Sequence, residues 1–446
     1  MNTTTIHISE ILNSQRIDVA YYKDNIRGKN YVPLSKYVDI KGGKRIPKGK
    51  SFSSENTDYL YLRLSDIEDF ECIDYSALKN ISEEIYNILK RYEIINNQIV
   101  FSIAGTIGRV FVIKNIPKGK RIILTENCAK LLPKNDAVLP DYVALLLNCN
   151  FVQKQIEQSR IQTTIPKIGL DRIAKLRIPE IPLTSIQQEI IELYSKAQEA
   201  RLKKNYEAKQ LLNSIDDNLF DILHIGKISD NKKSKVALKQ KVSSIIGGRF
   251  DPMQFHYERI EIVNRIKQGK WCRLKDVVNN EKTIITSLSQ DNIYIGMENI
   301  DGCTGEYCPS KEKESISSAA KFKDGDILFP KLRPYLNKVY RAQFDGCCST
   351  EFHVFEAHDI DPDFLTIVLR SNMILAQTKH LMTGNTLPRL QTTDIDNLII
   401  PCPDMNLQEE IVDSVSKIKD RAKKLKEEGN ALLEEAKQKI ENIILE

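Results

Sequence analysis

The sequence contains no long apolar run and no paired-cysteine motif. None of its 446 residues lie in an uninterrupted apolar stretch near the roughly 18 residues that a membrane helix requires. The N-terminal residues MNTTTIHISEIL have neither the basic nor the apolar region of a secretory signal, so we expect a cytoplasmic protein with no membrane partner. The nine cysteines lack C-x-x-C spacing, which argues against a disulfide framework and a structural zinc site.

Catalytic and cofactor motifs are also missing. The six histidines lie in no metal-ligand or triad-like pattern, and H-E-x-x-H, G-x-S-x-G and G-x-G-x-x-G do not occur. An autonomous methyltransferase or nuclease would need an N-P-P-Y/F signature or a cluster of carboxylates with a lysine, and neither is found. We therefore expect no catalytic residue, no metal and no cofactor bound by this chain, and interpret it as a binding protein.

Residues 42–51, GGKRIPKGKS, come closest to a phosphate-binding loop. A P-loop needs a glycine five positions before the glycine of its Gly-Lys-Ser, and that position is Lys44. Pro47 also removes one backbone N–H from the loop. What remains is a loop with four cations, Lys44, Arg45, Lys48 and Lys50. Such a loop could hold a nucleotide, grip a nucleic-acid backbone or face solvent, and the decapeptide alone leaves these alternatives open.

Positive charge is concentrated in two stretches. The formal net charge of the chain is +5. Residues 27–50 carry eight Lys/Arg against Asp39, a net +7, and residues 225–245 carry six lysines against Asp230, a net +5. Localised basic segments on a balanced chain are typical of a polyanion-binding protein. The stretch 225–245 fits an ordinary solvated linker equally well.

The chain contains an internal repeat. The matched segments, in order along each half, are RIDVAYY (16–22) with RFDPMQF (249–255), YLRLSDI (61–67) with YIGMENI (294–300), QIVFS (98–102) with DILFP (326–330), GRVFV (108–112) with NKVYR (337–341), LTE (124–126) with STE (349–351), TTIPKI (163–168) with NTLPRL (385–390), and RIPEIPLTSIQQEII (177–191) with IIPCPDMNLQEEIV (399–412). Each match is weak alone, but seven in the same order indicate a tandem duplication.

Each half ends in a predicted long helix with an apolar stripe. We expect these helices at about residues 186–223 and 407–444, with Gly429 as the one interruption. Apolar side chains recur at coiled-coil spacing, so the two helices should pair. The predicted capping boxes are Ser185 with Gln188 and Asn406 with Glu409, and the predicted packing residues are Ile190, Leu193, Ile411 and Val415.

The segments before the helices predict α+β domains with mostly antiparallel or mixed sheet. Short β-rich runs such as QIVFS and DILFP are broken by Gly, Pro and Asn and alternate with short helices, unlike the regular pattern of a doubly wound fold. The expected organisation is a first domain at 1–182, a central helical region at 183–224, a basic linker at 225–245, a second domain at 246–403 and a C-terminal helical region at 404–446.

The order of these motifs resembles the DNA specificity subunit of type I restriction-modification systems. The resemblance is carried by a GG-x-x-x-P loop, YLYLRLSDI, an AGTIGRV turn, T-x-P-x-I/L, and P-x-x-x-x-Q-x-x-I at residues 182–190 and 403–411. It implies two tandem target-recognition domains, each reading one half of a split, asymmetric DNA site. It also implies that the helices pair as an antiparallel coiled coil with pseudo-twofold symmetry.

The resemblance further implies partners that carry out the chemistry. Two modification (methyltransferase) subunits would dock on the helices and use S-adenosylmethionine to methylate adenine N6. Restriction/translocase subunits would use ATP and Mg. The chain itself would be a non-catalytic subunit that binds double-stranded DNA in defence against foreign DNA. The alternatives are a helical scaffold and a DNA-binding subunit of a related defence system without a type I nuclease.

We predict DNA contacts on loops of both halves. In the first half, Lys44, Arg45, Lys48 and Lys50 are candidates for phosphate or groove-edge contacts, Arg63 and Arg109 for guanine, and Thr106, Thr164 and Lys167 for neighbouring contacts. The matching residues of the second half are Lys331, Arg333, Tyr335, Asn337, Lys338, Thr386 and Arg389.

Overall fold

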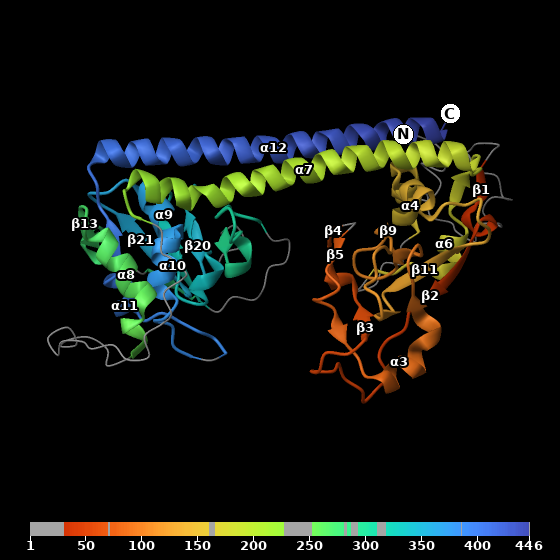
Figure 1. Cartoon of the computed structure of the whole chain (residues 1–446), viewed down its shortest axis with the longest axis horizontal. Helices are drawn as coiled ribbons and strands as arrows, with labels where there is room; N and C mark the ends of the chain where they lie inside the picture. Colours follow the sequence, from red (N-terminus) through yellow and green to blue (C-terminus); the bar gives the residue numbers. More distant parts are fainter. Residues whose placement is uncertain are drawn as a thin grey trace. The chain divides into compact units, whose positions relative to one another are not determined.

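The protein folds into two compact units, each with one domain and one half of each long helix (Figure 1). Unit 1 comprises Met1–Lys203 and Glu428–Glu446, and unit 2 comprises Lys204–Glu427. The computed structural model describes residues 31–69, 72–159, 166–226, 252–280, 283–286, 293–309, 318–384 and 386–445.

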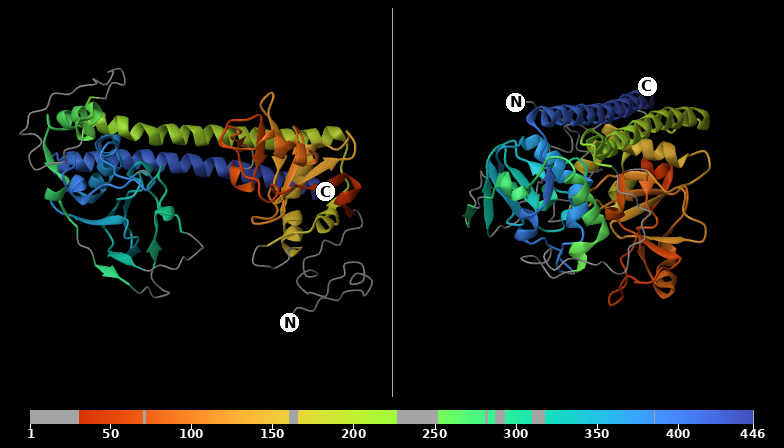
Figure 2. Two further views of the ribbon diagram at one scale, coloured as in Figure 1. Left: turned by 90° about the horizontal axis from the view of Figure 1, so that it is seen from below. Right: turned by 60° about the vertical axis from the view of Figure 1, so that its left-hand side comes forward.

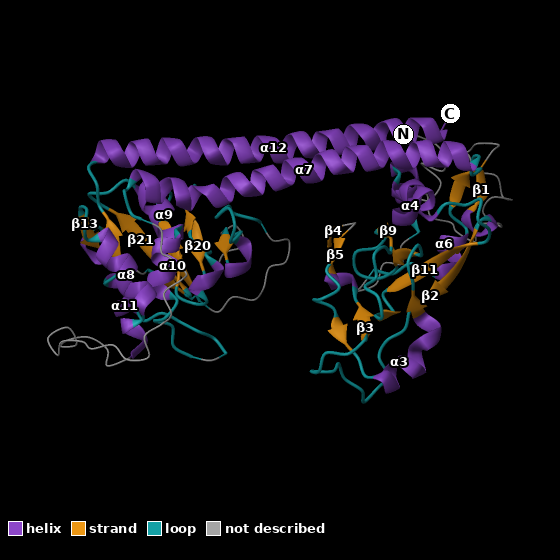
Figure 3. Ribbon diagram, in the orientation of Figure 1, coloured by secondary structure: helices purple, strands orange, loops and turns teal. Residues whose placement is uncertain are grey.

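Unit 1 is built from short strands and short helices (Figure 3). Its strands are β1 (Tyr31–Pro33), β2 (Val38–Gly42), β3 (Tyr59–Leu62), β4 (Ile67–Asp69), β5 (Cys72–Ile73), β6 (Lys79–Asn80), β7 (Glu93–Ile94), β8 (Ile99–Ser102), β9 (Val110–Val112), β10 (Arg121–Leu124), β11 (Cys128–Pro133) and β12 (Arg177–Pro179). Its helices are α3 (Glu83–Leu89), α4 (Pro140–Asn148), α5 (Asn150–Gln158) and α6 (Leu170–Ala174), followed by α7 (Thr184–Ile222).

Two four-stranded sheets form the body of unit 1. The sheet β2-β11-β8-β9 is antiparallel, whereas the sheet β6-β3-β10-β7 contains one parallel pair, β3 with β10. Apolar side chains from both sheets, including Leu62, Val100 and Ile122, share one buried core. In Figure 1, β1 lies near α7 and α3 lies at the opposite end of the unit. The unit therefore has a helix-proximal end and a distal end.

Unit 2 repeats this plan with other residues. Its strands are β13 (Trp271–Arg273), β14 (Val278–Asn279), β15 (Ile284–Ile285), β16 (Tyr294–Ile295), β17 (Ala319–Phe322), β18 (Ile327–Pro330), β19 (Tyr340–Arg341), β20 (Gly346–Cys348), β21 (Phe352–Ala357) and β22 (Ile399–Pro401). Its helices are α8 (Tyr257–Ile266), α9 (Pro362–Arg370), α10 (Asn372–Thr378) and α11 (Thr392–Asp396), followed by α12 (Met405–Leu445). The four-stranded sheets have the orders β14-β21-β18-β19 and β15-β17-β20-β16.

The repeat holds at the level of strand register. Ile99 of β8 pairs with Val112 of β9, and Ile327 of β18 pairs with Arg341 of β19, as the sequence matches predict. The parallel pair β3 with β10 recurs as β16 with β20. The edges of this sheet differ, because β6 adds beside β3 in unit 1 whereas β15 adds beside β17 in unit 2. The tandem duplication is thus confirmed in the order of the elements.

The two long helices begin about one half-turn earlier than predicted. α7 begins at Thr184 and α12 at Met405. At the start of α12, the Asp404 carboxylate accepts the backbone N–H of Leu407 at 3.2 Å. The predicted capping boxes, Ser185 with Gln188 and Asn406 with Glu409, were wrong because all four residues lie inside the helices. Asp404 precedes the predicted cap by two residues and supplies the same kind of side-chain acceptor.

Within unit 1, the first part of α7 packs antiparallel against the last part of α12. Arg201 Nε donates to Asn430 Oδ1 at 3.1 Å, and Ile190 shares a buried core with Ile440. Residue numbers thus rise along one helix as they fall along the other. A Cβ on Gly429 would lie 3.4 Å from the Arg201 Cα, so this glycine lets the two backbones approach closely. Both views in Figure 2 also show α7 beside α12.

The same pairing occurs within unit 2. Ala208 of α7 is buried with Ala422 and Leu425 of α12. Of the predicted packing residues, Ile190, Ile411 and Val415 are 0–2% exposed, and Leu193 is half-buried against the core of unit 1. The predicted pairing of two helices is therefore confirmed.

A buried glutamine joins each domain to its helix. Gln187 Oε1 accepts the backbone N–H of Leu139, the residue before α4, at 2.9 Å, and Nε2 donates to the carbonyl of the proline five residues earlier at 2.8 Å. Gln408 makes the same two bonds, to Asp361 before α9 at 2.8 Å and to its own preceding proline at 2.9 Å. Both glutamines are at most 1% exposed. They are the glutamines of the repeated P-x-x-x-x-Q-x-x-I motif.

The α+β class and the tandem arrangement are confirmed. The predicted linker at 225–245 lies outside the described residues except for its first two positions. None of the helices among the described residues is both long enough and apolar enough to cross a membrane.

Candidate nucleic-acid interface

In unit 1, two predicted contact loops lie side by side. The backbone N–H of Gly105 donates to the Pro166 carbonyl at 3.3 Å, and Ile168 donates to the Ile103 carbonyl at 3.0 Å. These bonds make a bridge between Ala104 and Lys167. The AGTIGRV turn and the T-x-P-x-I segment therefore form one surface, a loop pair. Thr164 lies outside the described residues, so its placement stays a prediction.

Unit 2 forms the same loop pair. Arg333 donates its backbone N–H to the Pro388 carbonyl at 2.8 Å, and Leu390 donates to the Lys331 carbonyl at 3.0 Å. Leu332 and Arg389 form the bridge that corresponds to Ala104 and Lys167. The loop pair is thus a repeated backbone structure on which the two units place different side chains.

A glutamate beside each loop pair binds a different cation. Glu126 of LTE lies 2.6 Å from Arg45 Nε, and Glu351 of STE lies 2.7 Å from Arg389 Nη2. The Arg389 hydrogen bonds lower the pKa of Glu351. At Glu126, burial raises the pKa, but the hydrogen bonds from Arg45 and from neighbouring groups outweigh burial and leave the pKa lowered. Both glutamates are therefore ionised near neutral pH and orient an exposed arginine.

The basic loop after β2 extends this surface of unit 1 towards the distal end. Lys50 Nζ lies 2.8 Å from Glu84 of α3, which places the loop beside that helix. Lys44 and Lys48 are exposed, and their ammonium groups have no carboxylate partner in the part of the chain that the structure describes. A Cβ on Gly43 would lie 2.0 Å from the Thr125 carbonyl oxygen, so a glycine is needed where the loop crosses β10. Two cations of this loop are consequently available to phosphate.

Arg63 lies at the end of β3 on a turn that both units share. In unit 1, the backbone N–H of Arg63 donates to Asp66 at 2.9 Å, and in unit 2 Gly296 donates to Asn299 at 2.8 Å. The Arg63 guanidinium also binds Asp66, with Nη2 at 2.6 Å from Oδ1. Because a glycine suffices for the turn in unit 2, the arginine side chain is not needed to form it.

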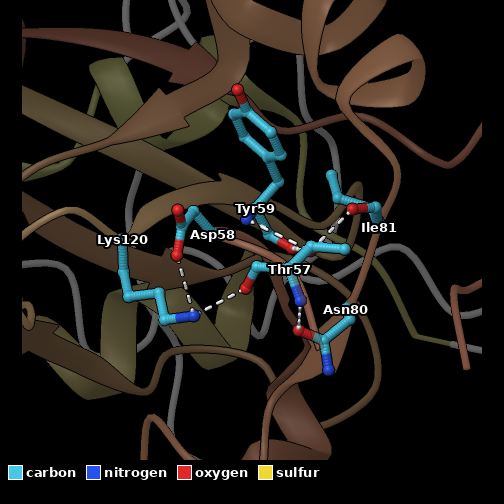
Figure 4. Close-up of polar contacts among 6 residues, drawn as sticks. All are labelled: Thr57, Asp58, Tyr59, Asn80, Ile81 and Lys120. Atoms are coloured by element: carbon cyan, nitrogen blue, oxygen red, sulfur yellow. Dashed lines mark hydrogen bonds and ion pairs between the residues drawn. The ribbon is translucent and has the colours of Figure 1, made fainter. Parts of the chain in front are cut away.

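The strand that carries Arg63 is fixed at its other end. The Thr57 hydroxyl lies 2.9 Å from the carbonyls of Tyr59 and Ile81, which ties the start of β3 to the segment after β6 (Figure 4). Lys120, just before β10, donates to the Thr57 carbonyl at 2.6 Å and pairs with Asp58 at 3.1 Å. These contacts hold the start of β3 against β10. Because Arg63 follows β3 directly, they also fix the position of its backbone.

The AGTIGRV turn is closed by a buried serine. Ser102 Oγ accepts the backbone N–H of Arg109 at 2.8 Å and donates to the Thr106 carbonyl at 2.6 Å. Thr106 is exposed, and its contact with DNA stays a prediction. Arg109 is half-buried, and its Nη2 donates to the Ile67 carbonyl at 3.3 Å. The turn therefore presents Thr106 outwards and keeps Arg109 close to the protein.

Several predicted residues of unit 2 are engaged inside the domain. Lys331 Nζ donates to the Thr350 carbonyl at 2.7 Å, and Lys338 Nζ donates to the Met297 carbonyl at 2.6 Å. Asn337 ends a short 3-10 turn, Pro334–Leu336, with φ 52°, and its Nδ2 donates to the Arg370 carbonyl at 2.8 Å. These three side chains position the turn, and a direct contact with DNA stays a prediction for each of them.

Two other predicted residues of this unit point outwards. Tyr335 is 51% exposed at the tip of the turn, and Thr386 on the neighbouring loop is exposed. Both side chains are accessible to solvent, and a direct contact with DNA stays a prediction for each of them.

One family model matches most of the chain. It is described as the type I restriction modification DNA specificity domain, and it matches residues 28–212 and 263–435. The chain belongs to this family. The two matched segments fall on the two domains together with parts of both long helices, so each unit contains one specificity domain.

Individual relatives are distant. The EcoDI specificity subunit of Escherichia coli is 28% identical over 152 residues, which span 33% of this chain and 34% of that protein. The MjaVIII specificity subunit of Methanocaldococcus jannaschii is 23% identical over 379 residues, or 82% of each chain.

Two solved structures also resemble the fold. The type I restriction-modification S subunit from M. genitalium shares 13% identity with a TM-score of 0.39, and covers 94% of this chain and 98% of that one. A chain from a structural study of complex assembly and conformational transition of the type I R-M system shares 14% identity with a TM-score of 0.47 and the same two coverages.

Sequence reasoning missed three residues that shape these specificity domains. Glu126 and Glu351 orient arginines of the surface, and their repetition in LTE and STE was a signal that could have identified them. Arg370 at the end of α9 donates to the carbonyls of Asn337 and Val339, at and just after the end of the 333–338 turn, and to those of Gly302 and Cys303, so it ties this turn to a distant segment. No pattern around Arg370 distinguishes it from an exposed arginine, because its acceptors come from segments distant in sequence.

Proposed function

We propose that this chain is the DNA specificity subunit of a type I restriction-modification complex, and that each unit reads one half of a bipartite site through its loop pair. The observation that carries the proposal is the repetition of the loop pair on the same backbone hydrogen bonds. A backbone structure that is repeated in both units holds the loop side chains at fixed positions, and the identity of those side chains decides which base edges are read.

The differences between the loop pairs support an asymmetric site. Unit 1 has Gly105 and Arg63 where unit 2 has Arg333 and Gly296, so the arginines project from different positions. The lysine-rich loop after β2 in unit 1 also has no equally lysine-rich counterpart after β14, where the sequence reads Asn280-Glu281-Lys282. Two surfaces with different donor positions select different base sequences.

The proposed chemistry resides in partner subunits. The chain would bind double-stranded DNA and no cofactor, and would dock two modification subunits that use S-adenosylmethionine to methylate adenine N6. Restriction/translocase subunits with ATP and Mg would complete the complex. The lack of known catalytic motifs in the sequence and the membership of the specificity family support this assignment.

Domain exchange tests the proposal. Residues 16–182 are replaced by the corresponding domain of another family member, the chimera is co-expressed with its cognate modification subunits, and genomic adenine methylation is sequenced. We expect one half of the methylated motif to change and the other half to stay the same. The reciprocal exchange of residues 246–403 should change only the other half. Changes in both halves with either chimera, or an unchanged motif with both, would contradict the assignment of one half-site to each unit.

A further inference from the structure

Three potential metal ligands of unit 2 come together between the start of α8 and the segment after α10. His256 precedes α8, Glu258 lies in the first turn of α8, and His380 lies two residues after α10. One donor atom from each lies within 4.8 Å of the others. Glu258 and His380 are 122 residues apart in the chain. That separation explains why no metal-ligand spacing is visible in the sequence.

The donor atoms are close to the separations of a bound metal. Glu258 Oε2 lies 3.1 Å from His380 Nε2 and 3.9 Å from His256 Nδ1. Tetrahedral ligands at zinc distances are separated by about 3.4 Å. The His256 ring must also rotate out of its stack on His380, with an interplanar angle of 24°, because an imidazole nitrogen binds a metal in the plane of its ring.

The surroundings of His256 favour a ligand at this position. Its Nδ1 atom is buried and has no hydrogen-bond partner within the described residues. Its ring lies against that of His380 with centroids 3.6 Å apart, so a rotation of the ring rather than a movement of the backbone would direct Nδ1 towards the other two donors. A buried ring nitrogen without a partner loses hydration on folding, and a metal ion would restore a bond to it.

We propose that His256, Glu258 and His380 bind a divalent transition-metal ion such as Zn²⁺ or Co²⁺. Two imidazole nitrogens and one carboxylate oxygen form a donor set typical of these ions. The three side chains are 11–26% exposed, so an ion can enter and water can complete its coordination. The ion links the start of α8 to the end of α10 and stabilises unit 2. This inference is independent of the proposed DNA-binding function.

Lys379 competes with the ion for the carboxylate. Its ammonium group lies 3.3 Å from Glu258 Oε2, and its side chain is 59% exposed. Metal binding must displace this ammonium, which can move into solvent because the side chain is long and largely exposed. Removing the lysine charge should therefore strengthen metal binding, whereas removing a ligand should weaken it.

Titration of the untagged, reduced full-length chain with Co²⁺ tests the site. The visible d–d absorption of cobalt reports its coordination, and Zn²⁺ should displace it. We expect one equivalent to bind without a sulfur-to-cobalt charge-transfer band. His256→Ala and His380→Ala should each weaken binding at least about tenfold. Lys379→Met keeps all three ligands and should tighten binding about fivefold at low ionic strength.

His358→Ala provides the matched control. His358 also lies beside an acid, with Nδ1 3.2 Å from Asp359 Oδ2, but belongs to no three-ligand group in the described part of the chain. Its replacement should leave the titration unchanged. Circular dichroism without metal checks that each variant is folded. Equal affinities for wild type, His380→Ala and Lys379→Met, a thiolate band, or no binding by the folded wild type would overturn the proposed site.

Discussion

Gly105 and Arg333 occupy the same position in the two loop pairs and both have a positive φ, 76° and 48°. Each donates its backbone N–H to the carbonyl of the proline on the neighbouring loop. A glycine adopts this conformation freely, whereas an arginine is strained by about 1–2 kcal/mol. Residues in strained backbone conformations are often found at functional sites, where the side chain is needed although glycine would relieve the strain.

Arg333→Gly should therefore increase stability and weaken DNA recognition. We expect the free energy of unfolding to rise by about 0.5–1 kcal/mol, because relief of strain exceeds the added entropy of the unfolded chain. Chemical denaturation of the full chain measures the first effect, and methylome sequencing with the modification subunits measures the second. Asp359→Gly is the control, since Asp359 has φ 58° outside the loop pair. A variant that is more stable but keeps its full sequence preference would exclude a recognition role for the Arg333 side chain.

Arg370 should control the shape of the 333–338 turn. Its guanidinium donates to the carbonyls of Asn337 at 2.9 Å and Val339 at 3.0 Å, and to two further carbonyls. Arg370→Met removes the donor to these four carbonyls, three of them in part-buried bonds, and we expect a loss of about 2–4 kcal/mol in unfolding free energy. Among chains that remain folded, the methylated motif should be relaxed in one half only.

The control for this prediction is Arg341→Met, which removes a guanidinium whose ion-pair partner is the half-exposed carboxylate of Asp363, at 3.2 Å. We expect a loss of less than about 1 kcal/mol there. Equal losses for the two variants would mean that the carbonyl bonds of Arg370 contribute little.

Neutralising Lys44 and Lys48 should reduce the salt dependence of DNA binding. If each ammonium contacts one phosphate, the slope of log affinity against log salt should become shallower by about 2 for the double Gln variant. Fluorescence anisotropy with the assembled complex at several salt concentrations gives this slope. Lys36→Gln with Lys134→Gln is the matched control, because Lys134 follows the opposite end of the β2–β11 pair and both lysines already bind acids. An unchanged slope would place the basic loop away from DNA.

Gln187 should contribute more to the free energy of unfolding than Gln188, the next residue on the same helix. Replacing Gln187 with leucine leaves the buried Leu139 N–H without an acceptor, which costs about 1–3 kcal/mol. Gln408→Leu should have a similar effect in unit 2. Gln188→Leu, at an exposed position, should change the unfolding free energy by less than about 0.5 kcal/mol. A denaturation series in which all three variants behave alike would show that the buried amides are dispensable.

Much of the fold could be predicted because the repeat and the spacing of apolar residues can be recognised directly in the sequence. The matches at 98–102 and 326–330 aligned strands that turned out to share their register, and the apolar stripe identified Ile411 and Val415 as buried. These features depend on local periodicity. Helix starts were less accurate, because Asp404 and Asn406 are equally plausible caps until the preceding turn is known.

The pairing of charges could not be predicted in the same way. Arg45 binds Glu126, 81 residues away, and Arg370 binds carbonyls of segments that only the folded chain brings together. The metal-ligand cluster shares this property, since Glu258 and His380 belong to different helical segments. Sequence identified the cationic loops but not which cations are already occupied by the protein.

The buried glutamines also bear on how such chains diversify. Gln187 and Gln408 make the same bonds at the junction of domain and helix, and these bonds go to backbone atoms rather than to particular side chains. A genetic crossover that joins the domain of one half to the helix of the other would preserve this junction. The duplicated chain therefore has two equivalent domain–helix junctions, and if each unit reads one half-site as we propose, recombination at these junctions would produce new pairs of half-sites without loss of the junction hydrogen bonds.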